Sequence, residues 1–355
     1  MNLLWLAALA RDVGPTVGFR PGDPLPVLGD TARLDRGLQA AAGELAASAT
    51  RSDARLTPSA TRLALARAGY PGDARFYLAR AQGETPPAVL LEALPRGAPI
   101  DVGWAFRDGD GIRTWVLGWA PHRVSMDPVV RDVELGRGFY LRIDGARDPR
   151  LLVADPVGHV RELDAASGTA RWVSGFESPG EHRVEVIDGD RVELLFSVFV
   201  GADLPAATPL PGEAPRPDSV GSLPALYAAL DRLRADVGLP GLTRFGDFEP
   251  HARAHAACLA AEGLVAHATP NCPGVPALAQ RTHFPQARHT EDVAVGDTFS
   301  EAWERVRASP GHLQNLLCAE CTHASIGATV EAGRAWVVWE LLAFPEGRPE
   351  AVPVR

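Results

Sequence analysis

The chain contains 355 residues, with 35 basic and 44 acidic side chains and a formal net charge of −9. This length predicts two or three domains, and 46% hydrophobic against 22% charged residues excludes wholesale disorder. The acidic balance argues against a nucleic-acid binder. Because every basic residue is Arg, lysine nucleophiles and phosphate-binding lysines are excluded as well.

The first ten residues form a short apolar stretch that ends in Ala8-Leu9-Ala10, a small-residue triplet like those that precede signal-peptide cleavage sites. The stretch lacks the positively charged n-region of a signal peptide. Residues 1–10 are therefore interpreted either as a short signal segment or as a buried first helix or strand. No run of 18 or more apolar residues occurs, and no transmembrane segment is expected.

Residues 1–120 are predicted to form a small α+β domain. The first part has apolar residues at helical spacing, with Pro near the start of one helix and Gly after its end. Two strand-like runs then flank an Asp-Gly-Asp-Gly turn, which is typical of a hairpin. The expected elements are helices over 34–49, 57–69 and 87–94, then strands over 101–106 and 112–117.

Residues 121–203 change to short β-rich runs separated by Gly, Pro and Asp turns, which predicts a β-sandwich. The Ser178-Pro179-Gly180 turn before an alternating strand is similar to turns of immunoglobulin-like modules. Residues 204–221 are rich in Pro and predict a stiff, extended linker. The chain is therefore expected to be an α+β multidomain protein.

The segment 222–346 holds seven of the ten His and all four Cys, and the tail 347–355 follows it. The expected elements are helices over 223–237, 249–262 and 298–307, then strands over 324–330 and 335–342. His251 and His255 lie on one helical face, but the Glu of a zinc-protease motif is missing between them. His255 is therefore interpreted as a packed helix residue.

The string Ser309-Pro310-Gly311-His312-Leu313-Gln314-Asn315 resembles the Ser-Pro-Gly-His-Arg-x-Asn signature of bacterial members of the CAP superfamily. That family comprises cysteine-rich secretory proteins, antigen 5 and pathogenesis-related 1 proteins. Further segments match family motifs in the family's order across about a third of the chain. They are 239–242 (Leu-Pro-Gly-Leu), 252–256 (Ala-Arg-Ala-His-Ala), 265–267 (Val-Ala-His), 290–294 (Thr-Glu-Asp-Val-Ala), 322–327 (Thr-His-Ala-Ser-Ile-Gly) and 336–338 (Trp-Val-Val).

The resemblance implies an α-β-α sandwich with a cleft lined by His and Glu side chains that can hold a divalent cation, often zinc. Matched position by position, it implies a ligand-binding cleft with His267, Glu291, His312 and Asn315, of which the first three would be metal ligands. The family's second Glu is matched securely by neither Glu301 nor Glu304. The alternative is that Glu291 and His312 only hydrogen-bond the loops around the cleft.

The resemblance implies an exported bacterial protein, secreted or in the cell envelope, that binds a small molecule, lipid, glycan or peptide. A metal-dependent hydrolase using the same cleft and a structural or adhesion module are the alternatives. Ser309 is the only obvious nucleophile, but Ser-Pro-Gly reads more simply as a turn, so enzymatic activity is left open.

If His267 and His312 share a cleft, Cys272 is expected to lie near Cys318 and Cys321. We therefore expect one disulfide among these three, with Cys258 in a second disulfide or as a buried thiol. Were the protein cytosolic, Cys318-x-x-Cys321 would instead indicate redox or zinc chemistry.

Residues 30–120 are also a candidate for a degenerate CAP-like copy without any His. Both domains begin with Ala-rich helices and end in a Gly, a tight turn and a Trp-Val pair. A chance likeness between two α+β hairpins is the alternative, and different strand orders would reject the copy.

Overall fold

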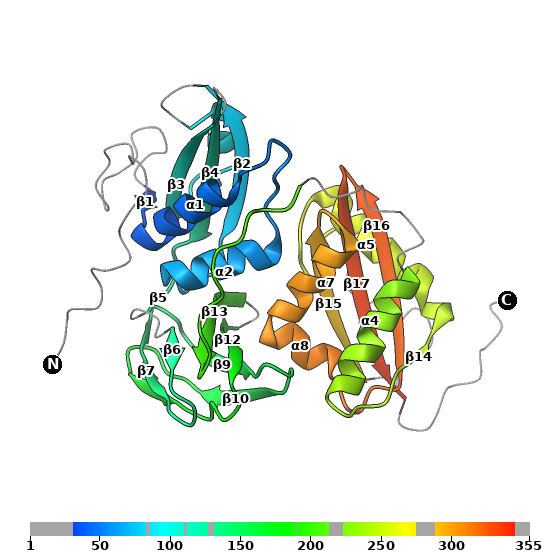
Figure 1. Ribbon diagram of the computed structural model, residues 1–355. Coiled ribbons are helices and arrows are strands. Elements are labelled where there is room, and N and C mark those ends of the chain that lie inside the picture. Colours follow the sequence, from blue (N-terminus) through cyan, green and yellow to red (C-terminus); the bar gives the residue numbers. More distant parts are fainter. Residues whose placement is uncertain are drawn as a thin grey trace. The chain divides into compact units, whose positions relative to one another are not determined.

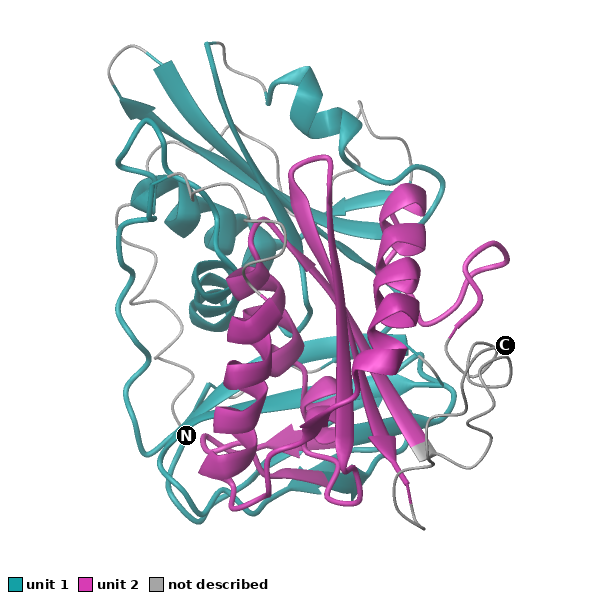
Figure 2. Cartoon of the chain, turned by 90° about the vertical axis from the view of Figure 1, so that its right-hand side faces the viewer, with its two compact units in different colours: residues 1–151, 162–213 teal, residues 152–161, 214–355 magenta. Residues whose placement is uncertain are grey.

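The computed structural model describes residues 31–344 except 83–85, 110–111, 127–130, 190, 213–222 and 275–287. The predicted signal segment 1–10 and the tail 347–355 lie outside the described residues. The chain divides into two compact units, residues 1–151 with 162–213 and residues 152–161 with 214–355 (Figure 2). No helix among the described residues has the length and apolarity needed to cross a membrane.

Unit 1 opens with a four-stranded sheet in the order β1-β3-β4-β2 (Figure 1). Asp35 begins α1 by accepting a hydrogen bond from the backbone of Leu38, and Thr57 begins α2 in the same way at Ala60. The elements are β1 (Ala32–Leu34), α1 (Arg36–Ser48), α2 (Pro58–Ala68), β2 (Arg75–Ala81), α3 (Ala88–Glu92), β3 (Ile100–Gly109) and β4 (Ile112–Pro121).

The following segment is all β, as its composition predicts. It forms a five-stranded sheet in the order β10-β9-β12-β13-β6 and two two-stranded ribbons, β11-β7 and β5-β8. The strands are β5 (Ser125–Met126), β6 (Asp132–Val133), β7 (Phe139–Leu141), β8 (Ile143–Asp144), β9 (Pro149–Ala154), β10 (Val160–Asp164), β11 (Arg171–Val173), β12 (Gly180–Asp188) and β13 (Arg191–Val200). An immunoglobulin-like topology stays a prediction.

The described part of the Pro-rich segment packs against unit 1. Leu210 is 2% exposed in an apolar cluster with residues of α1, and its N–H donates to the carbonyl of Ser48 at 2.8 Å. The carbonyl of Pro211 accepts a hydrogen bond from Arg55 at 3.0 Å. Because an extended backbone leaves its N–H and C=O groups free, this segment can hydrogen-bond to a neighbouring surface. The side chain of Leu210 packs into that surface.

Unit 2 is built on a sheet in the order β14-β16-β17-β15 with helices on both faces (Figure 1). Val337, Trp339 and Leu341 pack with α4, α7 and α8, whereas Trp336 and Val338, which alternate with them, pack with α5. The elements are α4 (Leu223–Asp236), β14 (Thr243–Arg244), the 3-10 helix η1 (Gly246–Phe248), α5 (Glu249–Glu262), β15 (Arg288–Gly296), α7 (Phe299–Ala308), α8 (Pro310–Leu316), β16 (His323–Glu331) and β17 (Arg334–Ala343). This layering agrees with the α-β-α sandwich that the resemblance implies.

The first sheet of unit 1 and the sheet of unit 2 share one topology. In each, a short first strand runs parallel to the third, and the remaining pairs are antiparallel. In each, a glycine of the third strand lies against the long helix that follows the first strand: a Cβ on Gly103 would overlap Leu38 and Gln39 of α1, and a Cβ on Gly327 would overlap Ala252 and Arg253 of α5. The matching strand order agrees with an internal copy.

Besides the short β14 and η1, two elements of unit 2 are missing from the sequence-based prediction. Strand β15 places Glu291 and Asp292 inside the protein, so it lacks the apolar alternation that marks a strand. The Ser-Pro-Gly string that indicates a turn is the cap and start of the short helix α8. Both elements carry residues of the site described next.

Candidate functional site

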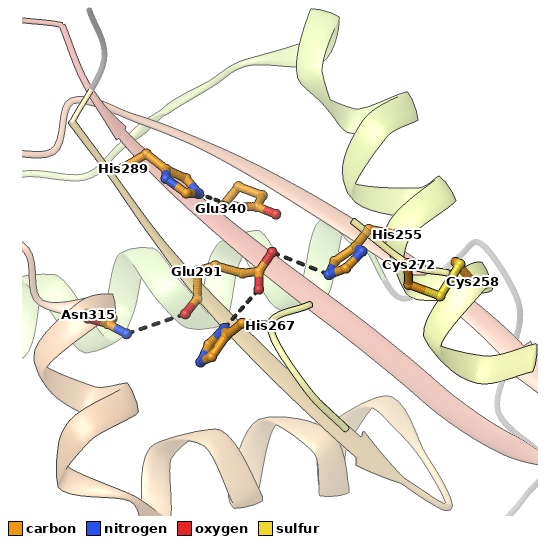
Figure 3. A network of polar contacts seen from close by, with 8 residues as sticks. All are labelled: His255, Cys258, His267, Cys272, His289, Glu291, Asn315 and Glu340. Atoms are coloured by element: carbon orange, nitrogen blue, oxygen red, sulfur yellow. Dashed lines mark hydrogen bonds and ion pairs between the residues drawn. A yellow bond between two sulfur atoms is a disulfide. The ribbon is translucent and has the colours of Figure 1, made fainter. Parts of the chain in front are cut away.

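Four segments that are distant in sequence bring polar side chains together at β15, an edge strand of its sheet. Glu291 comes from the strand itself, His255 from α5 and His267 from the loop after α5 (Figure 3). His312 comes from α8. We call His255, His267, Glu291 and His312 the His/Glu cluster. His267 lowers the pKa of His312 through space, which places these two imidazoles near each other.

Glu291 is the centre of the cluster. Its Oε1 lies 2.8 Å from Nδ1 of His267, and its Oε2 lies 3.5 Å from Nε2 of His255 (Figure 3). The side chain of Glu291 is 6% exposed and that of His255 is 1% exposed, whereas the His267 side chain is 60% exposed. The buried carboxylate is therefore joined to solvent through the His267 ring.

His312 is held in place by the cap of its own helix. Ser309 begins α8, and its hydroxyl accepts a hydrogen bond from the His312 backbone N–H at 3.2 Å. The Nδ1 atom of the His312 ring is inaccessible to solvent and has no hydrogen-bond partner. Burial, with a contribution from His267, lowers the pKa of His312 to about 4, so the ring is neutral at pH 7.

Asn315 ties α8 to the strand that carries Glu291. Its Nδ2 donates to Oδ1 of Asp292 at 2.9 Å and to the backbone carbonyl of Glu291 at 3.3 Å (Figure 3). Asp292 is 0% exposed, so Asn315 supplies a hydrogen bond to a carboxylate withdrawn from water. The predicted cleft residue Asn315 is thus next to the cluster, where it positions the strand.

A second His and Glu pair lies beside the cluster. His289 and Glu340 meet at 3.1 Å, and the Glu340 side chain is 0% exposed (Figure 3). Burial first, and then the charge of Glu291, raise the pKa of Glu340 well above its ordinary value, and burial lowers the pKa of His289. Glu340 lies in an otherwise apolar strand, and a lone acid among Trp and Leu residues is the signal that could have revealed it.

The other predicted residues have different positions. His255 is packed in its helix as expected, with 3% exposure, but it also faces Glu291, which the sequence interpretation missed. Glu301 accepts a hydrogen bond from the backbone of Asp297 at the start of α7, and Ser309 caps α8. Glu301 and Ser309 therefore both accept backbone hydrogen bonds at helix starts, and the position of the family's second Glu stays open.

The donor set of the cluster, imidazole nitrogen and carboxylate oxygen, is one that suits zinc. His255 Nε2, Glu291 Oε2 and His312 Nδ1 are also buried without a hydrogen-bond partner. Yet no group of three or more His, Cys, Asp or Glu side chains in the described ranges is arranged to hold a metal ion. The metal site predicted at His267, Glu291 and His312 therefore stays a prediction.

The disulfide pairing agrees with the expectation of one bond among Cys272, Cys318 and Cys321 and a second bond to Cys258, but Cys272 does not lie beside the other two. Cys258 bonds to Cys272, and Cys318 bonds to Cys321. Cys272 is buried against α5 with Ala256 and Leu259, so it lies on the α5 face of the sheet, whereas Cys321 packs with the core of the opposite face. The sheet therefore separates the two pairs, which the sequence interpretation had placed together.

No family model matches this chain, and no curated protein matches it. Among solved structures, an outer surface protein of Borrelia burgdorferi is 15% identical with a TM-score of 0.32, covering 36% of this chain and 98% of its own. An extracellular SCP-domain protein of Bacillus anthracis is 13% identical with a TM-score of 0.32, covering 61% and 69% of the two chains. A cysteine-rich secretory protein of Staphylococcus aureus is 12% identical with a TM-score of 0.30, covering 56% and 68%.

Proposed function

We propose that this chain is an exported CAP-domain protein that binds a polar ligand through the His/Glu cluster. The observation that carries the proposal is the convergence of His255, His267, Glu291 and His312 from four separate segments. Each of the four belongs to a segment that resembles a CAP motif.

Two disulfides support a location outside the cytoplasm. All four Cys are paired, and such bonds form and persist in oxidising compartments. The proposed location is therefore the cell envelope or the extracellular space.

The chemistry of the cluster favours a ligand with hydroxyl, amine or amide groups. Glu291 Oε2 has its ion-pair partner, Nε2 of His255, 3.5 Å away, which is beyond ordinary hydrogen-bond distance, and the neutral His312 ring has an unpartnered Nδ1. A ligand group that hydrogen-bonds to both atoms would shorten the one long contact and satisfy the other atom. Glycans, lipid head groups and peptides all carry such groups.

The test is ligand binding by the full chain and two variants. Thermal shift and calorimetry with soluble glycans, lipid vesicles and peptides should give a ligand whose affinity falls about tenfold or more in Glu291→Gln and His312→Ala, as expected when a buried polar group loses its partner. His251→Ala is the matched control, because His251 lies on the same helix as His255 and is half-buried outside the cluster. Equal loss in the control, or no effect of either variant, would contradict the proposal.

A metal-dependent hydrolase is the second candidate, favoured by the three unpartnered nitrogen and oxygen atoms of the cluster. His255, His267, Glu291 and His312 would hold the cation, which would activate a water molecule for attack. Metal analysis of the purified chain and of His312→Ala tests it. One bound divalent ion that the variant loses, together with hydrolysis that depends on it, supports this candidate, whereas ligand binding unchanged by chelators supports the first.

A further inference from the structure

The turn after α8 carries a disulfide that contributes little to stability. Cys318 and Cys321 are three residues apart, whereas Cys258 and Cys272 are 14 apart. A disulfide that closes a shorter loop removes less freedom from the unfolded chain. The Cys318–Cys321 bond is therefore the one whose opening costs the fold less.

A buried guanidinium lies against this turn. Arg234 of α4 is 0% exposed, and its Nη1 donates to the carbonyls of Leu316 and Cys318, both at 3.0 Å. Its Nε donates to the carbonyl of Pro240, and its Nη2 is buried without a partner. Within the described ranges Arg234 makes no ion pair, and the carboxylate that acts on its charge through space is that of the exposed Asp231.

The other disulfide has the opposite electrostatic surroundings. Glu262 accepts hydrogen bonds from Thr269 and Asn271, both at 2.7 Å, and Thr269 in turn accepts one from the backbone of Cys272. A carboxylate thus lies next to the Cys258–Cys272 loop. Thiolates are stabilised by a nearby cation and destabilised by a nearby anion, so bond opening is favoured at Cys318–Cys321.

The two sulfurs of the short bond differ in access. Cys318 is half-buried, Cys321 is 3% exposed, and Ala319 and Glu320 between them are exposed. The carboxylates of Glu320 and Glu262 are both in contact with solvent, which screens their charges more strongly than that of the buried Arg234, so Arg234 is the charge that distinguishes the two bonds. An incoming thiolate therefore reaches Cys318 first and leaves Cys321 as the departing sulfur.

We propose that Cys318 and Cys321 form an exchangeable redox couple that reacts with low-molecular-weight thiols and their disulfides. In the reducing direction a thiolate attacks Sγ of Cys318, the Sγ–Sγ bond breaks, and its electron pair passes to Cys321 as a thiolate. A second thiolate attacks the outer sulfur of the mixed disulfide and releases Cys318, so two thiols are oxidised to one disulfide as the protein gains two electrons.

The couple is connected to the end of α8. The N–H of Cys318 donates to the carbonyl of Asn315 at 3.0 Å, and Asn315 holds the strand of Glu291. The proposal itself does not depend on what the His/Glu cluster binds.

The test compares the two disulfides of the native full chain. The protein is incubated with increasing dithiothreitol or glutathione, quenched with N-ethylmaleimide, and mapped by peptide mass. Cys318 and Cys321 should be alkylated about tenfold faster than Cys258 and Cys272, because the surrounding charges differ in sign. Opening of Cys258–Cys272 first, or at an equal rate, would overturn the proposal.

Variants isolate the role of Arg234. In Cys321→Ser the single thiol of Cys318 should show an alkylation pKa below the ordinary value of about 8.5, and a value at or above it would contradict the proposal. Arg234→Gln should slow opening of the short bond, whereas Arg232→Gln, on the same helix but exposed, should not. If Arg234→Gln does not fold, Arg234→Lys is the alternative, because it keeps the positive charge. Its rate of opening of the Cys318–Cys321 bond should stay within a few fold of wild type. A tenfold loss would contradict a role for the charge of Arg234.

Discussion

Glu291 and Glu340 lie directly opposite each other in the antiparallel pairing of β15 with β17. Both are buried, and neighbouring carboxylates cannot both be charged at low cost. Burial and the charge of Glu291 raise the pKa of Glu340, so Glu340 is the protonated member of the pair, and Glu291 is the member in contact with His267 and His255. Two acids in equivalent positions on adjacent strands thus have different roles, because only Glu291 faces the imidazoles of α5 and its loop.

The first prediction concerns Glu340→Gln. Because the folded pKa of Glu340 lies above its unfolded value near 4.5, the wild-type chain loses stability as pH rises above that value, and a neutral Gln does not. The variant should gain stability relative to wild type from pH 5 to pH 8, measured by urea unfolding. A constant difference across this range would contradict a protonated Glu340. Glu340→Ala should be less stable than Glu340→Gln by about 2–4 kcal/mol at every pH, because it leaves a cavity and an unpaired His289.

The second prediction concerns His312. Its folded pKa of about 4 lies below the unfolded value of 6.5, so the unfolded chain binds a proton that the folded chain does not. This group therefore removes up to about 3 kcal/mol of stability as pH falls from 6.5 to 4. His312→Gln should show a weaker loss over that window than wild type in urea unfolding. The imidazole signal of His312 should titrate near pH 4 by NMR, and titration near 6.5 would refute the prediction.

The third prediction concerns Asn315, which donates to Asp292 and to the backbone of Glu291. Asn315→Ala should cost about 1–3 kcal/mol in unfolding free energy, because a buried carboxylate loses a hydrogen bond. Asn315→Asp should cost more, since it adds a negative charge beside Asp292. Gln314→Ala, at an exposed position of the same helix, is the control and should change stability by less than about 0.5 kcal/mol.

The fourth prediction concerns the two glycines that contact a helix backbone. Gly103→Ala and Gly327→Ala should each destabilise their unit by several kcal/mol, about 3 or more, because the added Cβ overlaps main-chain atoms that cannot move away. Gly109→Ala and Gly246→Ala are matched controls, since nothing lies within 4 Å of the added atom. Thermal unfolding of all four tests this, and equal effects in tests and controls would contradict the close approach.

Much of the local structure followed from the sequence. The Pro at the start of α2, the Gly after α2 and α5, and the hairpins β3-β4 and β16-β17 depend on short-range signals in the sequence. Strand β15 did not follow, because its polar residues are buried by tertiary contacts that a local pattern cannot express.

His and Cys are concentrated in 222–346, the segment that contains the His/Glu cluster. His267, Glu291, His312 and Asn315 could be proposed from motif order alone. The sequence could not show that His255 and Glu340 join them, nor which cysteines pair. Those outcomes depend on which face of the sheet each side chain occupies. The face is decided only when β15 pairs with β17 and α5 packs on them, because strand register and burial are set by contacts between segments that are distant in sequence.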